Sequence, residues 1–196
     1  MSIGDRVDVA LRPIATVLFF LGAAIASAAE VEVFDLPRLM QLLAATPAAE
    51  VSFTEKKFSS LLSEPVVSSG KLLYRRPDSV EKIIETPRKE SYRFERDVLV
   101  LTRAGAEKRI PLSSQPLLSA FAASLRGLLG GDLALLRNHY QLSLQGDEQS
   151  WRLDMTPVDE EIGRYVQRIT ASGRAGRIGQ IEVGESSGDR SVLQVR

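Results

Sequence analysis

The sequence predicts a mainly β protein with a helical cover (α+β), built on an antiparallel sheet of ten or eleven strands. Short strand-like runs follow one another at a spacing of roughly 8–12 residues, with turn residues between them. One apolar helical segment, residues 114–130, interrupts this series near the middle and carries a single charge, Arg126. Because a twisted sheet of that many strands tends to curl, the helical segment is the natural cover for its concave face.

Composition excludes several classes of function. The chain has 196 residues, of which 44% are hydrophobic and 26% charged, as in folded globular proteins. Its 25 basic residues balance its 25 acidic residues, which argues against nucleic acid as a partner. The absence of cysteine excludes disulfides, thiolate zinc sites and a cysteine-linked lipid anchor. With a single histidine, His139, no multi-histidine metal site can form, and we expect neither metal nor cofactor.

Residues 1–28 are expected to be a cleavable signal peptide. Two arginines precede an apolar run over 14–25, and small residues at 26–28 form a cleavage site. The run is shorter than the roughly 20 residues that span a bilayer, although an uncleaved membrane anchor is the alternative. We therefore expect residues 29–196 to be a single exported domain, periplasmic and monomeric.

The first half of this domain is expected to hold one helix and six strands. The helix covers 34–45, where Asp35 can cap the first turn and Thr46-Pro47 ends it. Arg96-Asp97 is a plausible hairpin turn between two of the strands. The six strands are expected at 51–58, 69–76, 80–86, 91–95, 98–102 and 108–112.

The second half is expected to hold a short helix and five strands. Gly130-Gly131 ends the long helical segment, and Asp132 can cap a second helix over 133–137. The acidic run 159–161 is expected to be a solvated turn rather than a metal site. The five strands are expected at 140–145, 151–156, 166–171, 178–183 and 191–195.

Five segments, in the order in which they occur along the chain, resemble the LolA family, the periplasmic carriers of outer-membrane lipoproteins. The most specific segment is SGKLLYRRP at 69–77, which is similar to the family's G-x-L-W/Y-x-[KR]-R-P signature. Two features depart from the family: the hairpin at 94–100 lacks its usual glycine, and little chain follows the last strand. The second departure leaves open both the outer-membrane acceptor and the cargo, which could be a glycolipid. The other four segments are VSFTEKKF at 51–58, IETP at 84–87, GDLALLRNHY at 131–140 and WRLDMTP at 151–157.

The resemblance implies an incomplete antiparallel β-barrel, closed by lid helices around an apolar cavity for acyl chains. It implies an inner-membrane transporter as donor, and an arginine, here Arg76, that holds the lid shut by hydrogen bonds to lid backbone carbonyls. The residues support this independently, because Leu72, Tyr74 and Arg76 share one face of an extended strand. The alternative is that strand twist turns Arg76 to the solvated rim.

The helix at 114–130 is the expected lid, with an ordinary core helix as the alternative. Its leucines and phenylalanine form a stripe at helical spacing, and aromatic and aliphatic strand residues would line the cavity. Each of these residues could instead belong only to the core. The expected cargo contacts are Leu117, Leu118, Phe121 and Leu125 on the helix, and Phe53, Leu72, Tyr74, Ile84, Tyr92, Phe94 and Trp151 on the strands.

The function that these observations favour is non-enzymatic carriage of acyl chains of a lipoprotein or another acylated lipid toward the outer membrane. A second reading, on the same fold, is a sensor that binds a lipidated ligand and signals to a membrane protein. A third is an esterase that uses His139, but the chain has no G-x-S-x-G motif.

Overall fold

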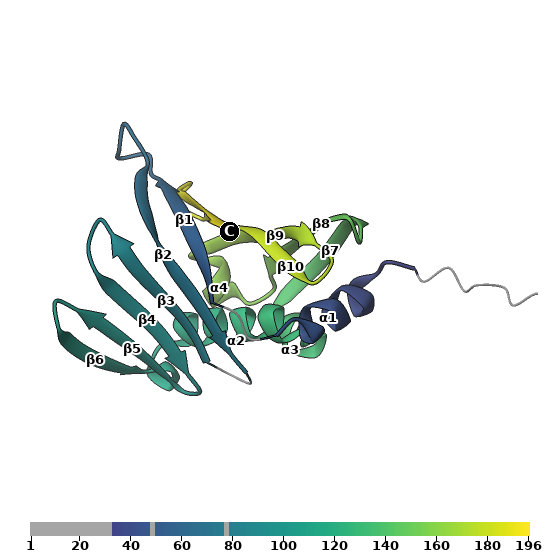
Figure 1. Cartoon of the computed structure of the whole chain (residues 1–196), viewed down its shortest axis with the longest axis horizontal. Coiled ribbons are helices and arrows are strands. Elements are labelled where there is room, and N and C mark those ends of the chain that lie inside the picture. The colour runs from purple at the N-terminus through teal and green to yellow at the C-terminus, as the bar shows by residue number, and fades with distance from the viewer. Residues whose placement is uncertain (1–32, 48–49, 77–78) are drawn as a thin grey trace, which may run out of the picture. The chain divides into compact units, whose positions relative to one another are not determined.

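The computed structural model describes residues 33–47, 50–76 and 79–196. Figure 1 shows these residues as ribbons, within the unit Val33–Arg196. The expected signal peptide, 1–28, lies outside the described residues. Within the described part, none of the helices has the length and apolar character that crossing a bilayer requires.

In the described part of the chain, eleven antiparallel strands form one sheet in the order β6-β5-β4-β3-β2-β1-β11-β10-β9-β8-β7. Among the described residues the sheet does not close on itself, since β6 and β7 are its edges. This confirms the predicted mainly β fold, an incomplete barrel with helical cover. The strands are β1 (Glu50–Phe58), β2 (Val66–Arg75), β3 (Ser79–Thr86), β4 (Glu90–Glu95), β5 (Val98–Arg103), β6 (Ala106–Pro111), β7 (Tyr140–Asp147), β8 (Ser150–Pro157), β9 (Val166–Arg174), β10 (Arg177–Glu185) and β11 (Arg190–Val195).

The sheet consists of two meanders that meet where the first and last strands pair. β1 runs antiparallel to β11, with Phe53 opposite Val195, so β1–β6 make a first half and β7–β11 a second. The helices between β6 and β7 pass from one half to the other (Figure 1). The chain therefore covers its own sheet with a segment from its middle, as the sequence predicts.

Capping residues set the ends of the helices. The Asp35 carboxylate accepts a hydrogen bond from the Arg38 amide at 2.9 Å, and Asp132 accepts one from the Leu135 amide at 2.9 Å. Both caps confirm the sequence prediction. The helices are α1 (Leu36–Ala45), the 3-10 turn η1 (Leu112–Ser114), α2 (Pro116–Gly130), α3 (Leu133–Arg137) and α4 (Glu160–Gly163).

Two local predictions were wrong. The acidic run at 159–161 begins a one-turn helix, α4, because the Asp159 carboxylate accepts a hydrogen bond from the Glu161 amide at 2.8 Å. Leu112 does not end a strand. It lies in η1, where its amide donates to the Asp97 carbonyl at 2.7 Å and its side chain is buried. Its apolar character reflects packing under α2 rather than strand alternation.

The buried side chains form two clusters on the helix-covered face of the sheet. The first cluster joins α1, α3 and the end of α2 to strands β7–β9, and the second joins α2 and η1 to β4 and β5. The first contains Leu39, Met40, Leu43, Leu128, Leu136, Tyr140, Trp151, Leu153, Met155, Ile169 and Ala171, and the second contains Phe94, Leu99, Leu112 and Ala122.

Helix α1 is seated tightly on the second half of the sheet. A Cβ on Gly131, whose φ is +71°, would lie 2.1 Å from the Met40 carbonyl oxygen, so only glycine allows this approach. Similarly, a Cβ on Gly176 would lie 2.3 Å from the Leu42 carbonyl oxygen. The Thr46 hydroxyl donates to the Gly176 carbonyl at 2.8 Å. Backbone contacts on two sides therefore fix the position of α1.

Candidate functional site

The two clusters leave a strip of apolar residues between them at the centre of the sheet. Tyr74 lies opposite Val80, which lies opposite Phe94 of the second cluster, so all three face the helices. We call this strip, which spans β1, β2 and β3, the apolar floor. Its side chains are buried at Phe53 and Val80 and half-buried elsewhere. The apolar floor consists of Phe53, Leu72, Tyr74, Val80 and Ile84.

Helix α2 covers this face and contacts both clusters. Ala122 belongs to the second cluster and Leu128 to the first. The buried Ser124 hydroxyl donates to the Tyr140 hydroxyl at 2.8 Å, which fixes α2 to β7. At the C-terminal end of α2, a Cβ on Gly130 would lie 3.4 Å from the Tyr74 hydroxyl oxygen. α2 thus passes along the Tyr74 end of the apolar floor and contacts β3; Figure 1 shows the helix near the ends of β2 and β3.

Four of the expected cargo contacts gather around α2. Leu118, Leu125 and Tyr92 are half-buried and pack against the second cluster, which contains Phe94. The lid reading and the core reading both place them here, so their role in cargo binding stays a prediction. The side chains of Leu117 and Phe121, also on α2, lie outside the described part of the chain.

Trp151 lies apart from this group. It is 2% exposed and belongs to the first cluster, near α1. Its indole Nε1 donates to the Ala175 carbonyl at 2.8 Å, and a Cβ on Gly173 would lie 2.7 Å from its ring. Contact between Trp151 and a cargo would require the first cluster to open.

Arg76 binds the C-terminal end of α1. Its Nη2 donates to the carbonyls of Thr46 at 2.8 Å and Leu43 at 3.4 Å, and also to the carbonyl of Ala44. The guanidinium lies 5.6 Å from the centre of the Tyr74 ring. The last carbonyls of a helix have no partner within it and carry negative partial charge, so a guanidinium suits them.

This contact differs in one respect from the expected latch. The sequence predicts the lid at 114–130, whereas the carbonyls that Arg76 binds lie in the last turn of α1 and at its C-cap, Thr46. Arg76 follows β2, in the first half of the sheet, while α1 is seated on the second half. The three hydrogen bonds therefore link the two halves across the helix-covered face.

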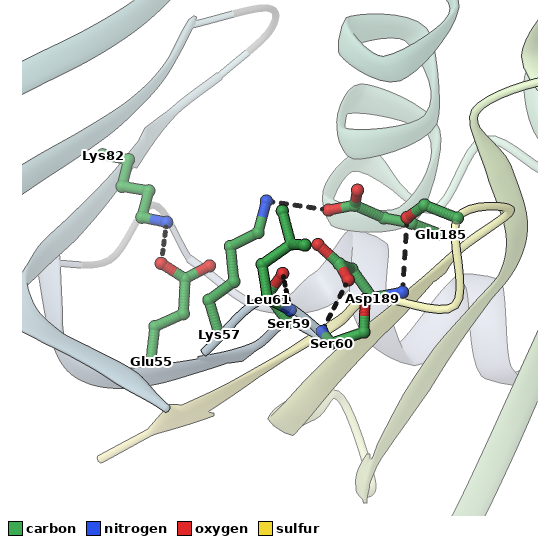
Figure 2. Close-up of polar contacts among 9 residues, drawn as sticks. Glu55, Lys57, Ser59, Ser60, Leu61, Lys82, Glu185 and Asp189 are labelled. Carbon is green, nitrogen blue, oxygen red and sulfur yellow. Dashed lines mark hydrogen bonds and ion pairs between the residues drawn. The ribbon is translucent and has the colours of Figure 1, made fainter. Parts of the chain in front are cut away.

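A set of charged residues that the sequence did not reveal lies on the same face, around Phe53 and beyond it. On β3, Lys82 lies opposite Leu72 and between Val80 and Ile84. The Lys82 ammonium donates to the Glu55 carboxylate at 2.6 Å and lies 5.2 Å from the centre of the Phe53 ring. The Lys57 ammonium donates to Glu185 at 2.9 Å (Figure 2). We call these four charged residues the polar rim. Alternation along β1 signals it, because Glu55 and Lys57 share the face of Phe53.

Three tyrosine and carboxyl groups near the clusters have shifted pKa values. Hydrogen bonds from Arg103 and then Tyr92 lower the pKa of the Glu90 carboxyl. Burial, and then the hydrogen bond to Glu90, raises the pKa of Tyr92. Burial also raises the pKa of Tyr140. All three groups thus keep their usual protonation states near neutral pH.

No group of three or more histidine, aspartate and glutamate side chains is arranged to hold a metal ion among the described residues. His139 follows α3, where its amide donates to the Leu136 carbonyl at 3.1 Å. The helix-covered face is mainly apolar. It carries the charged residues of the polar rim, and the guanidinium of Arg76 links the two halves of the sheet.

Comparison with known proteins identifies the family. A family model described as outer membrane lipoprotein carrier protein LolA-like matches residues 26–194. No protein of curated function matches the sequence. Among solved structures, a LolA superfamily protein from Nitrosomonas europaea is similar at 14% identity and a TM-score of 0.45, over 82% of this chain and 89% of that one.

Two other solved structures are similar over 82% of this chain. One is the MucA/MucB complex from Pseudomonas aeruginosa, at 12% identity and a TM-score of 0.46, over 55% of that chain. The other is the lipoprotein LppX from Mycobacterium tuberculosis, at 10% identity and a TM-score of 0.41, over 93% of that chain. The family match, which covers most of the sequence, shows that this chain belongs to the LolA-like family of outer membrane lipoprotein carrier proteins.

Proposed function

We propose that this protein is a periplasmic carrier that binds acyl chains of a lipoprotein or another acylated lipid and moves them toward the outer membrane. In this proposal residues 1–28 direct export and are removed, and an inner-membrane transporter supplies the cargo. The observation that carries the proposal is the apolar floor, whose Leu72, Tyr74 and Ile84 are half-buried between two closed clusters. No covalent step is needed.

The apolar floor and the inner side of α2 are the proposed binding surface. An acyl chain that enters between them would replace contacts among Leu118, Leu125 and Tyr92 with contacts to its own methylenes. Each buried methylene contributes about 0.8 kcal/mol, so a chain of about 16 carbons contributes roughly 10 kcal/mol when fully buried. A binding surface that was already open would hold such a cargo too tightly to release it.

Closure of the empty protein lowers this affinity to a useful range. The packing of α2 on the two clusters and the hydrogen bonds from Arg76 to α1 stabilise the empty state. The loaded state lacks this stabilisation. The net affinity is then a difference between two burials, and a receptor can shift it with a small differential interaction. Arg76 is the latch in this scheme, acting on α1 and through it on the opening between the two halves.

The polar rim marks where the acyl chain ends and the polar part of the cargo begins. Glu55 and Lys82 are partly buried, with side chains 20% and 26% exposed, and satisfy each other. An acyl chain would not displace a paired charge of this kind. Because Lys82 lies between Val80 and Ile84 on β3, we place the acyl portion of the cargo over Leu72, Tyr74 and Val80, between the Glu55–Lys82 pair and α2, and the polar portion beyond that pair.

Native mass spectrometry of the protein isolated from its own envelope tests the proposal. The carrier predicts an added mass that matches an acylated molecule, lost when the protein is delipidated and regained with a fatty acid. A protein partner in place of lipid would favour the sensor. Hydrolysis of an acyl ester that depends on His139 would favour the esterase, and either result overturns the carrier.

A further inference from the structure

The loop between β1 and β2 exposes leucines at the end of a projecting hairpin. We call residues 59–65, with the sequence SSLLSEP, the tip loop (Figure 1). Leu61 is 91% exposed and Leu62 is 50% exposed. Adjacent exposed leucines at a convex tip keep apolar surface in water, which is unfavourable unless something covers them.

The backbone of the tip loop is held by hydrogen bonds. The Ser60 amide donates to the Asp189 carboxylate at 3.2 Å, which ties the loop to the turn between β10 and β11 (Figure 2). The Leu61 amide donates to the Ser59 hydroxyl at 3.4 Å, and the Leu62 amide to the Ser59 carbonyl at 3.1 Å. The amides of Ser60, Leu61 and Leu62 are therefore hydrogen-bonded while both leucine side chains stay exposed.

The strand positions below the tip loop combine apolar and basic side chains. Lys57 lies opposite Val66, and Lys56 opposite Val67. The two valines are 50% and 47% exposed, and strand alternation puts one lysine–valine pair on each face of the hairpin. From the tip downward, the order is leucine, then serine hydroxyls with Glu64 and Pro65 on the β2 side, and then lysine with valine. That order matches the depth profile of a bilayer interface, from acyl chains to phosphates.

We propose that the tip loop inserts Leu61 and Leu62 into the surface of a phospholipid bilayer. A bilayer accepts a convex tip of two leucines without a shaped pocket, and Lys56 and Lys57 lie at the height of its phosphates. The inference rests on the proposed function in one respect: β1 and β2 also carry the apolar floor, so the inserted tip places the polar rim close to the membrane.

The charges near the tip loop predict how binding depends on salt. Lys57 is paired with Glu185, and Glu64 and Asp189 add further negative charge to the neighbourhood. The lysines are thus locally offset, and the leucines supply most of the affinity. We expect binding to vesicles to fall only slightly between low and physiological salt, because apolar insertion is not screened.

Co-sedimentation with vesicles of phosphatidylethanolamine and phosphatidylglycerol tests the proposal. The sample is the protein in the form in which the cell exports it. The double variant L61S/L62S should lower the partition coefficient at least about tenfold, since full burial of one leucine corresponds to about a factor of ten or more in partitioning. The matched control is V158S, whose valine is 59% exposed on another loop, and it should change partitioning less than about twofold.

A second variant locates the inserted residue. Leu61→Trp should add fluorescence that brominated lipids quench, whereas the buried Trp151 should not respond. Binding of a fluorescent fatty acid by L61S/L62S should equal that of the original chain, so a failed tip and a failed carrier give different results.

Three outcomes would overturn the proposal. The first is that the unsubstituted protein does not bind vesicles, and the second is that L61S/L62S binds them equally well. The third is that the unsubstituted protein forms dimers in the absence of vesicles and L61S/L62S does not. The last would assign the tip loop to a second copy of the chain.

Discussion

Replacing Arg76 with leucine should make the carrier hold its cargo more tightly. The substitution removes three hydrogen bonds from a charged donor to the carbonyls at the end of α1. A hydrogen bond to a charged group contributes about 1.5–3 kcal/mol when well formed. Because Arg76 is exposed and water competes for it, we assign that range to the whole set rather than to each bond.

That loss falls on the closed, empty state and not on the loaded one. The dissociation constant for a fluorescent fatty acid should therefore fall by about 10- to 100-fold in Arg76→Leu. Thermal unfolding gives an independent measure. The empty variant should unfold roughly 3–10 °C below the original chain, while the two proteins saturated with fatty acid should differ much less.

Arg75→Leu is the matched control, since Arg75 is the adjacent exposed arginine at the end of β2 and points to the opposite face. It should leave both the fatty-acid affinity and the stability of the empty state within experimental error. Equal or weaker fatty-acid binding by Arg76→Leu would refute the latch, as would an equal effect of Arg75→Leu.

Three further substitutions separate binding from stability. Leu72→Asp places a carboxylate on the half-buried apolar floor and should lower fatty-acid affinity at least tenfold while circular dichroism stays unchanged; retained affinity would move the binding surface elsewhere. Tyr140→Phe removes the hydrogen bond with Ser124 and should cost about 1 kcal/mol in denaturant unfolding. The raised pKa of Tyr140 stabilises the folded state fully below the pKa of tyrosine in the unfolded chain, and this stabilisation is lost as pH rises through the folded pKa. Tyr140→Phe should therefore also flatten the decline of the free energy of unfolding at alkaline pH. The hydrogen bond from Arg152, and then that from Thr170, lower the pKa of Asp154, so its stabilisation is present above the unfolded pKa and lost as pH falls through the folded one. Asp154→Asn should reduce the acid decline below about pH 4, and an unchanged acid limb would contradict this.

The sequence predicted the sheet because strands such as β8 alternate buried with exposed side chains and turn residues separate the strands. Alternation such as Trp151, Leu153 and Met155 fixes both the strand and its inward side, and the register confirms that these three share a face. The caps at Asp35 and Asp132 were equally predictable, since they depend only on residues three positions apart.

What the sequence could not supply were contacts between distant segments. The partner of Arg76 is α1, about 30 residues earlier in the chain, and no local pattern distinguishes the end of α1 from the end of α2. The salt bridge between Glu55 and Lys82 likewise depends on the pairing of three strands. α4 was missed because one turn of helix is too short to show periodicity.

The exposure of Leu61 was also hidden. Its serine-rich neighbourhood is typical of a connecting loop, and β2 begins at Val66, three residues before the predicted strand. Whether a loop leucine is covered depends on what packs over it, which only the folded chain decides.

Photo-crosslinking with a fatty acid that carries a diazirine near its methyl end tests the central claim most directly. After digestion, mass spectrometry identifies the labelled peptides. If acyl chains lie between α2 and the apolar floor, labels should fall within β1, β2, β3 and α2, and excess unlabelled fatty acid should abolish them. Labels confined to the outer face of the sheet, or labels that survive competition, would contradict the account.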